Sequence, residues 1–468
     1  MLLKDSATFI DEDAIHAALR RTRGCDPVLV RDVLAKARQL EGLDGDEVAM
    51  LASIDTPELM SELFATASWI KDEIYGSRLV LFAPLYVSNH CRNECAYCAF
   101  RANNMTLRRR ALTQDEIARE VRVLLRQGHK RLLLVAGESY PEGQGLDYIL
   151  RGIETIYATR EGRGEIRRVN VNIAPLSVAD FKRLKATEIG TYQIFQETYH
   201  RPTYARVHTA GIKKDFDWRV NAPGRAMMAG IDDVGIGVLF GLYDWKFEVL
   251  AMLQHIRHLE ERFGVGPHTI SVPRLEPASG SELAAHPPHA VSDDDFCKIV
   301  AILRLAVPYT GLIMSTRENP QTRRRTFAMG VSQISAGSRT NPGGYAELGP
   351  GDADEAQFQL GDHRSLDEVV RDCAELGYIP SFCTSCYRTG RTGQDFMDLA
   401  KPGAIKYHCG PNAIASLQEY LLDYASEETR RVGRRLIEQK LAEMDETCRD
   451  TTRTLLNLLN GNQRDVYV

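Results

Sequence analysis

The sequence predicts an α/β fold: a (β/α)8 barrel with a helical N-terminal cap and a mainly helical C-terminal extension. Two observations predict this fold. First, short apolar, β-rich runs alternate with amphipathic, helix-like stretches over residues 78–340. Second, there are eight such runs, and a (β/α)8 barrel has eight strands and typically spans about 250 residues. A doubly wound open sheet is the alternative architecture. The predicted strands are 79–87, 131–136, 168–173, 191–195, 234–240, 269–272, 312–315 and 331–335.

Residues 1–77 are predicted to form a helical segment in front of the barrel domain, 78–340. Ile15, Ala18 and Leu19 recur at helical spacing, and no motif of known chemistry stands out around them. Within the barrel domain, Thr113 and Glu116 form a capping box. In this motif each side chain satisfies a free amide at the start of a helix. We therefore expect a helix to begin there.

Residues 341–468 leave the repeat and are predicted to form a C-terminal domain. The segment 341–344, Asn-Pro-Gly-Gly, is a turn-rich break. Ser365 and Glu368 form a second capping box, and a helical tail rich in Glu and Arg runs from about 412 to 460.

The composition excludes several classes of protein. Of the 468 residues, 44% are hydrophobic and 26% are charged, which is ordinary globular usage and excludes a disordered or collagen-like chain. The net charge of -5 gives no reason to expect nucleic acid as a partner. No apolar run approaches the roughly 18 residues of a transmembrane span, and no signal peptide is recognised, so we expect a cytoplasmic protein. In that reducing compartment, ten cysteines indicate metal binding or catalysis rather than disulfides.

The first predicted strand leads into a compact group of three cysteines. Cys91, Cys95 and Cys98 have the spacing C-x3-C-x2-C. Three thiolates on one short loop can hold three corners of a 4Fe-4S cluster and leave the fourth iron open to another ligand. A structural zinc site with His90 as the fourth ligand is the alternative. The loop follows a barrel strand, where the active sites of such barrels lie, and this favours the cluster.

This motif on this loop resembles that of the radical S-adenosylmethionine (SAM) superfamily. The resemblance implies that the open iron binds SAM and that reduction releases a 5′-deoxyadenosyl radical. Gly137 and Glu138 match the element that binds the SAM amino group, and Tyr97 matches the aromatic residue beside the adenine. Glu197 and Arg219 are similar to the SAM contacts of the biotin-synthase-like branch. An ordinary surface pair is the alternative for these two charges.

A second group of three cysteines lies near the C-terminus. Cys383, Cys386 and Cys409 have the spacing C-x2-C-x22-C, and three thiolates again leave one metal position open. A zinc site completed by His408 or another histidine is the alternative.

The two cysteine groups together resemble the HydG family of FeFe-hydrogenase maturases. The resemblance implies a radical SAM lyase that cleaves the Cα–Cβ bond of L-tyrosine to p-cresol and dehydroglycine. Dehydroglycine is then converted to carbon monoxide and cyanide bound to iron. It also implies that the second trio holds an auxiliary iron-sulfur cluster with a fifth, labile iron, to which L-cysteine binds. Further matches lie at 100–103, 168–175, 192–202, 264–271 and 358–364.

Three more residues take their roles from related lyases. His268 resembles the histidine that binds the labile iron, and it lies at the start of a predicted strand, at the barrel end opposite the first cysteine loop. A hydrogen-bonded histidine at a strand edge is the alternative. Arg317 resembles the arginine that grips the amino-acid carboxylate, and Ser335 is expected to add a hydrogen bond. The resemblance also implies other hydrogenase maturases and an electron donor as partners.

Three other functions compete with this interpretation. 2-Iminoacetate synthase of thiamine synthesis performs the same cleavage, stops at dehydroglycine and lacks the C-terminal cysteine trio. A tryptophan lyase of the peptide-antibiotic type also lacks the trio. A zinc-stabilised binding or scaffold protein is the alternative from a different class.

Overall fold

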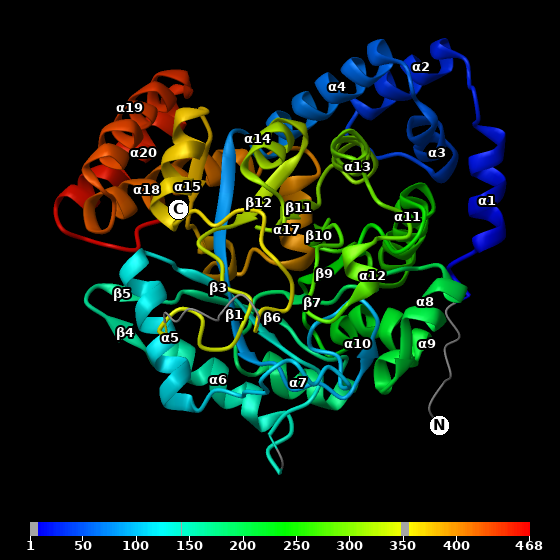
Figure 1. Ribbon diagram of the computed structural model, residues 1–468. Coiled ribbons are helices and arrows are strands. Elements are labelled where there is room, and N and C mark those ends of the chain that lie inside the picture. The colour runs from blue at the N-terminus through cyan, green and yellow to red at the C-terminus, as the bar shows by residue number, and fades with distance from the viewer. Residues whose placement is uncertain (1–7, 142, 348–354) are drawn as a thin grey trace.

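The centre of the molecule is a barrel of parallel strands, seen in a computed structural model that describes residues 8–141, 143–347 and 355–468 (Figure 1). The barrel strands are β1 (Arg78–Ser88), β3 (Arg131–Ala136), β6 (Arg168–Asn172), β7 (Tyr192–Gln193), β9 (Val234–Gly237), β10 (Thr269–Ser271), β11 (Gly311–Met314) and β12 (Val331–Ser335). β1 pairs with β3 on one side and with β12 on the other, where Val80 lies opposite Gln333. This closure confirms the predicted (β/α)8 barrel and contradicts the open-sheet alternative.

A ninth parallel strand comes from the C-terminal region. β13 (Ile379–Ser381) pairs with the first residues of β1, so that Leu79 lies opposite Pro380. The extension is therefore joined to the barrel sheet by backbone hydrogen bonds. A strand of three residues is too short to be recognised in the sequence, so this connection was not predicted. The shorter strands form two small antiparallel sheets: β2 (Glu94–Cys95) with β8 (His208–Ala210), and β4 (Arg160–Glu161) with β5 (Gly164–Glu165).

Helices surround the barrel and extend it on two sides. The N-terminal helices are α1 (Glu12–Arg21), α2 (Pro27–Ala37), α3 (Gly45–Ser53) and α4 (Pro57–Tyr75). The helices between the barrel strands are α5 (Gln114–Gln127), α6 (Asp147–Ala158), α7 (Val178–Lys185), α8 (Arg201–Val207), η1 (Ile212–Lys214), α9 (Phe216–Val220), α10 (Ala222–Met228), α11 (Trp245–Phe263), α12 (Glu282–Ala285), α13 (Asp293–Ala306) and α14 (Pro320–Met329). The C-terminal helices are α15 (Leu366–Glu375), α16 (Ser385–Arg388), α17 (Gly393–Ala400), α18 (Lys406–Asp423), α19 (Glu427–Glu443) and α20 (Glu446–Asn460).

The two predicted capping boxes are both present. Thr113 and Glu116 cap α5, and Ser365 and Glu368 cap α15, with reciprocal side-chain to backbone hydrogen bonds in each case. The predicted helical tail consists of three helices, α18 to α20. None of the described helices combines the length and the apolar character that a membrane crossing needs.

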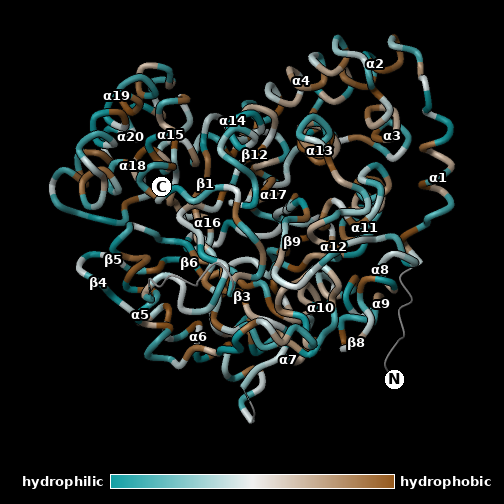
Figure 2. Tube along the Cα trace, viewed as in Figure 1, coloured by the Kyte–Doolittle hydropathy of each residue, from teal (hydrophilic) through white to brown (hydrophobic). Residues whose placement is uncertain are grey.

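The N-terminal helices cover one side of the barrel. α4 packs along α13 and α14, and α1 packs against α11. Leu63, Ala67 and Ile70 of α4 are fully buried in the main hydrophobic core. The outward α19, in contrast, is largely hydrophilic (Figure 2). We keep 1–77, 78–340 and 341–468 as the proposed division of the chain, with the first boundary falling between α4 and β1.

Parallel pairing gives the barrel two chemically different ends. Each strand ends at one rim, and each begins at the other. The loops that follow β1, β3, β7 and β11 share the first rim, whereas the segment 382–409 lies against the starts of the strands.

A buried ion pair fastens the C-terminal region to the last barrel strand. Arg323 of α14 pairs with Asp362, and both side chains are almost completely buried. Arg323 also donates a hydrogen bond from Nη2 to the Ser335 carbonyl oxygen at 2.7 Å. Arg364 Nη2 lies 2.7 Å from the same Asp362 carboxylate.

We expect Asp362→Ala to lower the free energy of unfolding by about 3–5 kcal/mol, because it leaves the buried Arg323 guanidinium without its counter-charge. Asp294→Ala is the matched control: its partner is Arg325, its side chain is 82% exposed, and removal of such a pair costs at most about 1 kcal/mol. Anaerobic urea unfolding measures both. Equal losses in the two variants would contradict the importance of the buried pair.

Candidate active site

The loop after β1 brings three thiols to the first rim of the barrel. Cys91, Cys95 and Cys98 line one cavity, which opens to solvent. Pairing of β2 with β8 holds the middle of this loop in place.

Gly137 permits a close approach between the end of β3 and the cysteine loop. Its N–H donates to the Ser88 carbonyl oxygen at 2.8 Å. A Cβ atom at this position would lie 2.3 Å from the His90 carbonyl oxygen. Only glycine therefore fits here, and it brings Glu138 to the cavity.

Two carboxylates and two cations form a network beside the three thiols. Arg219 joins both acids, with Nη1 2.7 Å from Glu138 Oε1 and Nη2 3.4 Å from Glu197 Oε1. Lys213 Nζ lies 2.6 Å from the same Glu197 oxygen, and Asn93 Nδ2 donates to Glu138 Oε2 at 2.7 Å. All of the charged groups are largely buried. Glu197 and Arg219 are thus not an ordinary surface pair.

The network keeps Glu138 and Lys213 charged. Burial alone would raise the pKa of Glu138, but Arg219 and Lys213 outweigh it and the pKa lies below its usual value. Burial and Arg219 oppose the charge of Lys213, yet the nearby Glu197, Cys95 and Glu138 raise its pKa overall. Such charges can pair with the ammonium and carboxylate groups of an amino-acid ligand.

Glu197 has a strained backbone. Its φ of 72° is uncommon for a residue with a side chain. The turn is held on both sides, since Leu239 N–H donates to the Glu197 carbonyl at 2.8 Å and Tyr199 N–H donates to buried Glu248 at 2.8 Å. Outliers of this kind cluster at functional sites.

Tyr97 is also fixed at the cavity wall. Its hydroxyl lies 2.8 Å from His208 Nε2, and its ring meets the His208 ring edge-on. Lys213 Nζ is 5.6 Å from the centre of the Tyr97 ring. Tyr97 therefore lines the cavity beside the charged network.

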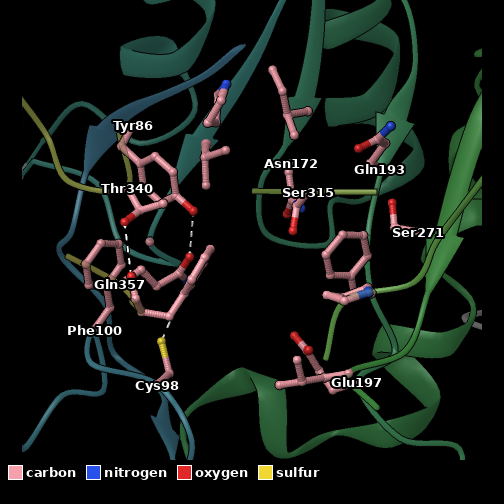
Figure 3. Close-up of a pocket in the computed structure, with 18 of the residues that line it drawn as sticks. Tyr86, Cys98, Phe100, Asn172, Gln193, Glu197, Ser271, Ser315, Thr340 and Gln357 are labelled. Atoms are coloured by element: carbon pink, nitrogen blue, oxygen red, sulfur yellow. Dashed lines mark hydrogen bonds between the residues drawn. The ribbon is translucent and has the colours of Figure 1, made fainter. Parts of the chain in front are cut away.

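The same cavity is also lined by Arg317 and Ser335. The Arg317 guanidinium lies 3.2 Å from the centre of the Phe358 ring, and no carboxylate of the described residues forms an ion pair with it. Ser335 Oγ accepts a hydrogen bond from Thr316 N–H at 3.0 Å, so it positions the residue before Arg317. Polar side chains of Asn172, Gln193, Ser271 and Ser315 face the cavity from the other wall (Figure 3).

The second cysteine trio lines a separate pocket at the opposite rim. Cys383 follows β13, Cys386 lies in α16 and Cys409 lies in α18. Burial raises the pKa of Cys409 to about 12, so its thiol is protonated at neutral pH unless a metal displaces the proton. Across the described residues, no three His, Cys, Asp or Glu side chains converge on a single metal-ion position.

His268 faces the second trio from the barrel. It directly precedes β10, lines the same pocket, and packs edge-on against Phe396 with ring centres 4.6 Å apart. Its Nδ1 atom lies 3.5 Å from Asp233 Oδ1, but it is buried without a hydrogen-bond partner. His408 instead approaches Arg391 Nη1 at 3.5 Å and does not line the pocket.

Arginines at the starts of three strands place positive charge around this second pocket. Arg78, Arg131 and Arg168 begin β1, β3 and β6. Arg131 Nη1 donates to the Cys383 carbonyl at 3.0 Å, and Arg168 stacks 3.5 Å from the centre of the Tyr387 ring. Thiolates and an iron-sulfur cluster carry negative charge, so these residues and the unpartnered His268 nitrogen fit such a group.

Comparison with known proteins identifies the family. Residues 85–254 match the model of the radical SAM superfamily, and residues 271–379 match that of the Biotin and Thiamin Synthesis associated domain. A crystal structure of HydG, a maturase of the FeFe-hydrogenase, is 48% identical with a TM-score of 0.95, over 99% of this chain and all of that one. The chain belongs to the HydG family. The expected radical SAM barrel is thereby confirmed.

Two further relatives of this HydG-family chain are informative. HydG from Carboxydothermus hydrogenoformans is 40% identical with a TM-score of 0.83, over 95% of this chain and 97% of that one. 2-Iminoacetate synthase of Escherichia coli (strain K12) is 31% identical over 346 residues, which are 74% of this chain and 88% of the relative. The zinc-stabilised scaffold has no support from these comparisons. A 4Fe-4S cluster and SAM are the cofactors that the superfamily implies.

The sequence motifs identify most of these cavity residues. Every residue expected to contact SAM or tyrosine lines the first cavity, and His268 lines the pocket of the second trio. Motif reasoning missed Lys213 and Asn93. Asn93 could have been noticed from its position inside the cysteine loop, whereas nothing in the sequence distinguishes Lys213 from Lys214.

We expect Lys213→Met to weaken SAM binding by about tenfold, because Glu197 loses a buried counter-charge and turns its carboxylate toward Arg219. Lys214→Met is the matched control, since Lys214 is its exposed neighbour. Equilibrium dialysis of SAM against the anaerobically reconstituted protein measures both dissociation constants. Equal affinities in the two variants would contradict a role for Lys213.

Proposed function

We propose that this chain cleaves the Cα–Cβ bond of L-tyrosine to p-cresol and dehydroglycine. It then converts dehydroglycine to carbon monoxide and cyanide on iron, for assembly of the FeFe-hydrogenase active site. The observation that carries the proposal is the second thiol trio with His268, at the far end of the barrel that holds the SAM-type site. The match to two HydG structures over almost the whole chain supports it.

At the first rim, Cys91, Cys95 and Cys98 would hold the 4Fe-4S cluster. The bound cluster and SAM supply a 5′-deoxyadenosyl radical that takes a hydrogen atom from the tyrosine amino group. Glu138, Glu197 and Arg219 would pair with the charged groups of SAM, and Tyr97 would lie beside its adenine.

Arg317 is proposed to bind the tyrosine carboxylate. The guanidinium is fixed against Phe358 and has no carboxylate of its own among the described residues, so an incoming carboxylate is its natural partner. Ser335 contributes through Thr316, whose N–H its hydroxyl holds.

At the second rim, Cys383, Cys386 and Cys409 would hold the auxiliary cluster, and His268 would bind the labile iron that leaves as cargo. The unpartnered Nδ1 atom of His268 supports this role. Dehydroglycine has the atoms of one carbon monoxide, one hydrogen cyanide and one water, so its breakdown here needs no further reactant. L-Cysteine is proposed as a further ligand of the iron.

We also propose a cytoplasmic location, in which free thiols stay reduced, with an electron donor and other hydrogenase maturases as partners. The alternative is 2-iminoacetate synthase activity, which the 31% identical relative favours. That reaction would stop at dehydroglycine. The two functions therefore differ only in what happens at the second rim.

Cysteine variants separate the two steps. We expect Cys95→Ala to abolish both p-cresol and carbon monoxide, because no cluster forms at the SAM end. Cys386→Ala should still release p-cresol, with carbon monoxide lowered at least tenfold. Cys448→Ala, at a half-buried cysteine of α20, is the control and should retain both products.

The assay traps carbon monoxide with ferrous haem protein and quantifies p-cresol in the same anaerobic tube. If Cys386→Ala released carbon monoxide at the wild-type rate, the role of the second trio would be wrong. If the wild-type chain with both clusters gave p-cresol alone, the 2-iminoacetate synthase alternative would replace the proposal.

Arg317→Ala tests substrate binding. We expect the KM for tyrosine to rise about tenfold or more, since a charge-assisted pair contributes about 1.5–3 kcal/mol. The SAM dissociation constant should stay within about twofold, because Arg317 is assigned to the substrate alone. An unchanged KM for tyrosine would reject the assignment.

A further inference from the structure

A short segment of the C-terminal region contributes to the wall of the first cavity. We call residues 357–359 the strap. Backbone hydrogen bonds fix it at both ends: Gln357 N–H donates to the Thr340 carbonyl at 3.0 Å, and Gln359 N–H donates to the Pro277 carbonyl at 2.8 Å. Phe358, between them, stacks on Arg317.

The Gln357 side chain reaches the cysteine loop (Figure 3). Its Nε2 atom donates to Cys98 Sγ at 3.7 Å, which is within hydrogen-bond range for sulfur. Its Oε1 atom accepts a hydrogen bond from the Tyr86 hydroxyl at 2.8 Å. The Ala99 N–H donates to the Gln357 carbonyl at 3.4 Å. The strap is thus bound to the third cysteine, Cys98, and to the residue that follows it, Ala99.

This contact distinguishes Cys98 from its two neighbours. Among the described residues, neither Cys91 nor Cys95 receives a side-chain hydrogen bond at its sulfur. The Tyr86 hydroxyl can donate or accept a hydrogen bond, whereas a thiolate that holds a cluster can only accept one. The amide N–H₂ group therefore faces the sulfur of Cys98, and Oε1 takes the hydrogen of Tyr86.

We propose that Gln357 is a positioning residue that raises the reduction potential of the 4Fe-4S cluster at the SAM end through its hydrogen bond to Cys98. Reduction adds negative charge that is shared by the ligating sulfurs, and an N–H donor stabilises that charge. Tyr86 strengthens the donor because accepting a hydrogen bond at Oε1 polarises the amide. The proposal rests on the radical SAM assignment and holds for either tyrosine-lyase function.

An EPR-monitored redox titration of the full chain, carrying both clusters, tests this role. The signal of the SAM-end cluster is recognised by its change when SAM is added, since only that cluster binds SAM. We expect Gln357→Leu to lower the ratio of reduced to oxidised cluster about tenfold at a fixed solution potential, which is a shift of ~59 mV to more negative potential for one electron.

Three further variants grade the effect. Gln357→Glu should shift the potential further in the same direction, because it replaces a donor with a negative charge. Tyr86→Phe should give a smaller shift of the same sign. Gln359→Leu is the matched control: the same residue type on the same strap, with an exposed side chain, should titrate like the wild type.

The outcomes distinguish tuning from a structural role. A wild-type potential in Gln357→Leu would overturn the proposal. So would loss of iron from the SAM-end site with an unchanged potential in the clusters that remain, because that result describes a purely structural contact. If Gln357→Leu fails to fold, Tyr86→Phe keeps every cluster ligand, and an unshifted potential in that variant would equally overturn the proposal.

Discussion

Parallel pairing of eight strands around a closed barrel is the constraint on which the rest of this structure depends. Because β12 returns to pair with β1, every strand start lies at one rim and every strand end at the other. Residues at strand ends, such as Glu138 and Arg317, therefore share one cavity. Residues at strand starts, such as Arg131 and His268, share the opposite pocket. Two sites with separate chemistry follow directly from strand direction.

The charged groups of each site are arranged to suit what it would hold. At the first rim, acids and bases alternate: Arg219 bridges the buried Glu138 and Glu197, and Lys213 pairs with Glu197. At the second rim, arginines outnumber acids around three thiols. The first arrangement suits a zwitterionic amino-acid group, and the second suits an anionic cluster.

Much of this architecture could be predicted from the sequence. Strands such as β1 and β3 were predictable because buried parallel strands are rich in apolar residues, and the capping boxes of α5 and α15 because their motif is local. The cysteine trios were predictable from spacing. β13 was not, because a three-residue strand carries no periodic signal and forms only where β1 offers an edge. Lys213 and Gln357 were missed for a related reason. Lys213 contacts Glu197 and Gln357 contacts Cys98, and only the fold brings the two residues of each pair together.

The most direct test of the two-site account is a single-turnover time course with carboxyl-¹³C-labelled tyrosine and the full chain carrying both clusters. p-Cresol and ¹³C-labelled carbon monoxide would be quantified at each time point. The account predicts that p-cresol appears first, that labelled carbon monoxide follows after a lag, and that the carbon monoxide formed never exceeds the p-cresol. Carbon monoxide that appears without p-cresol, or that carries no label, would contradict it.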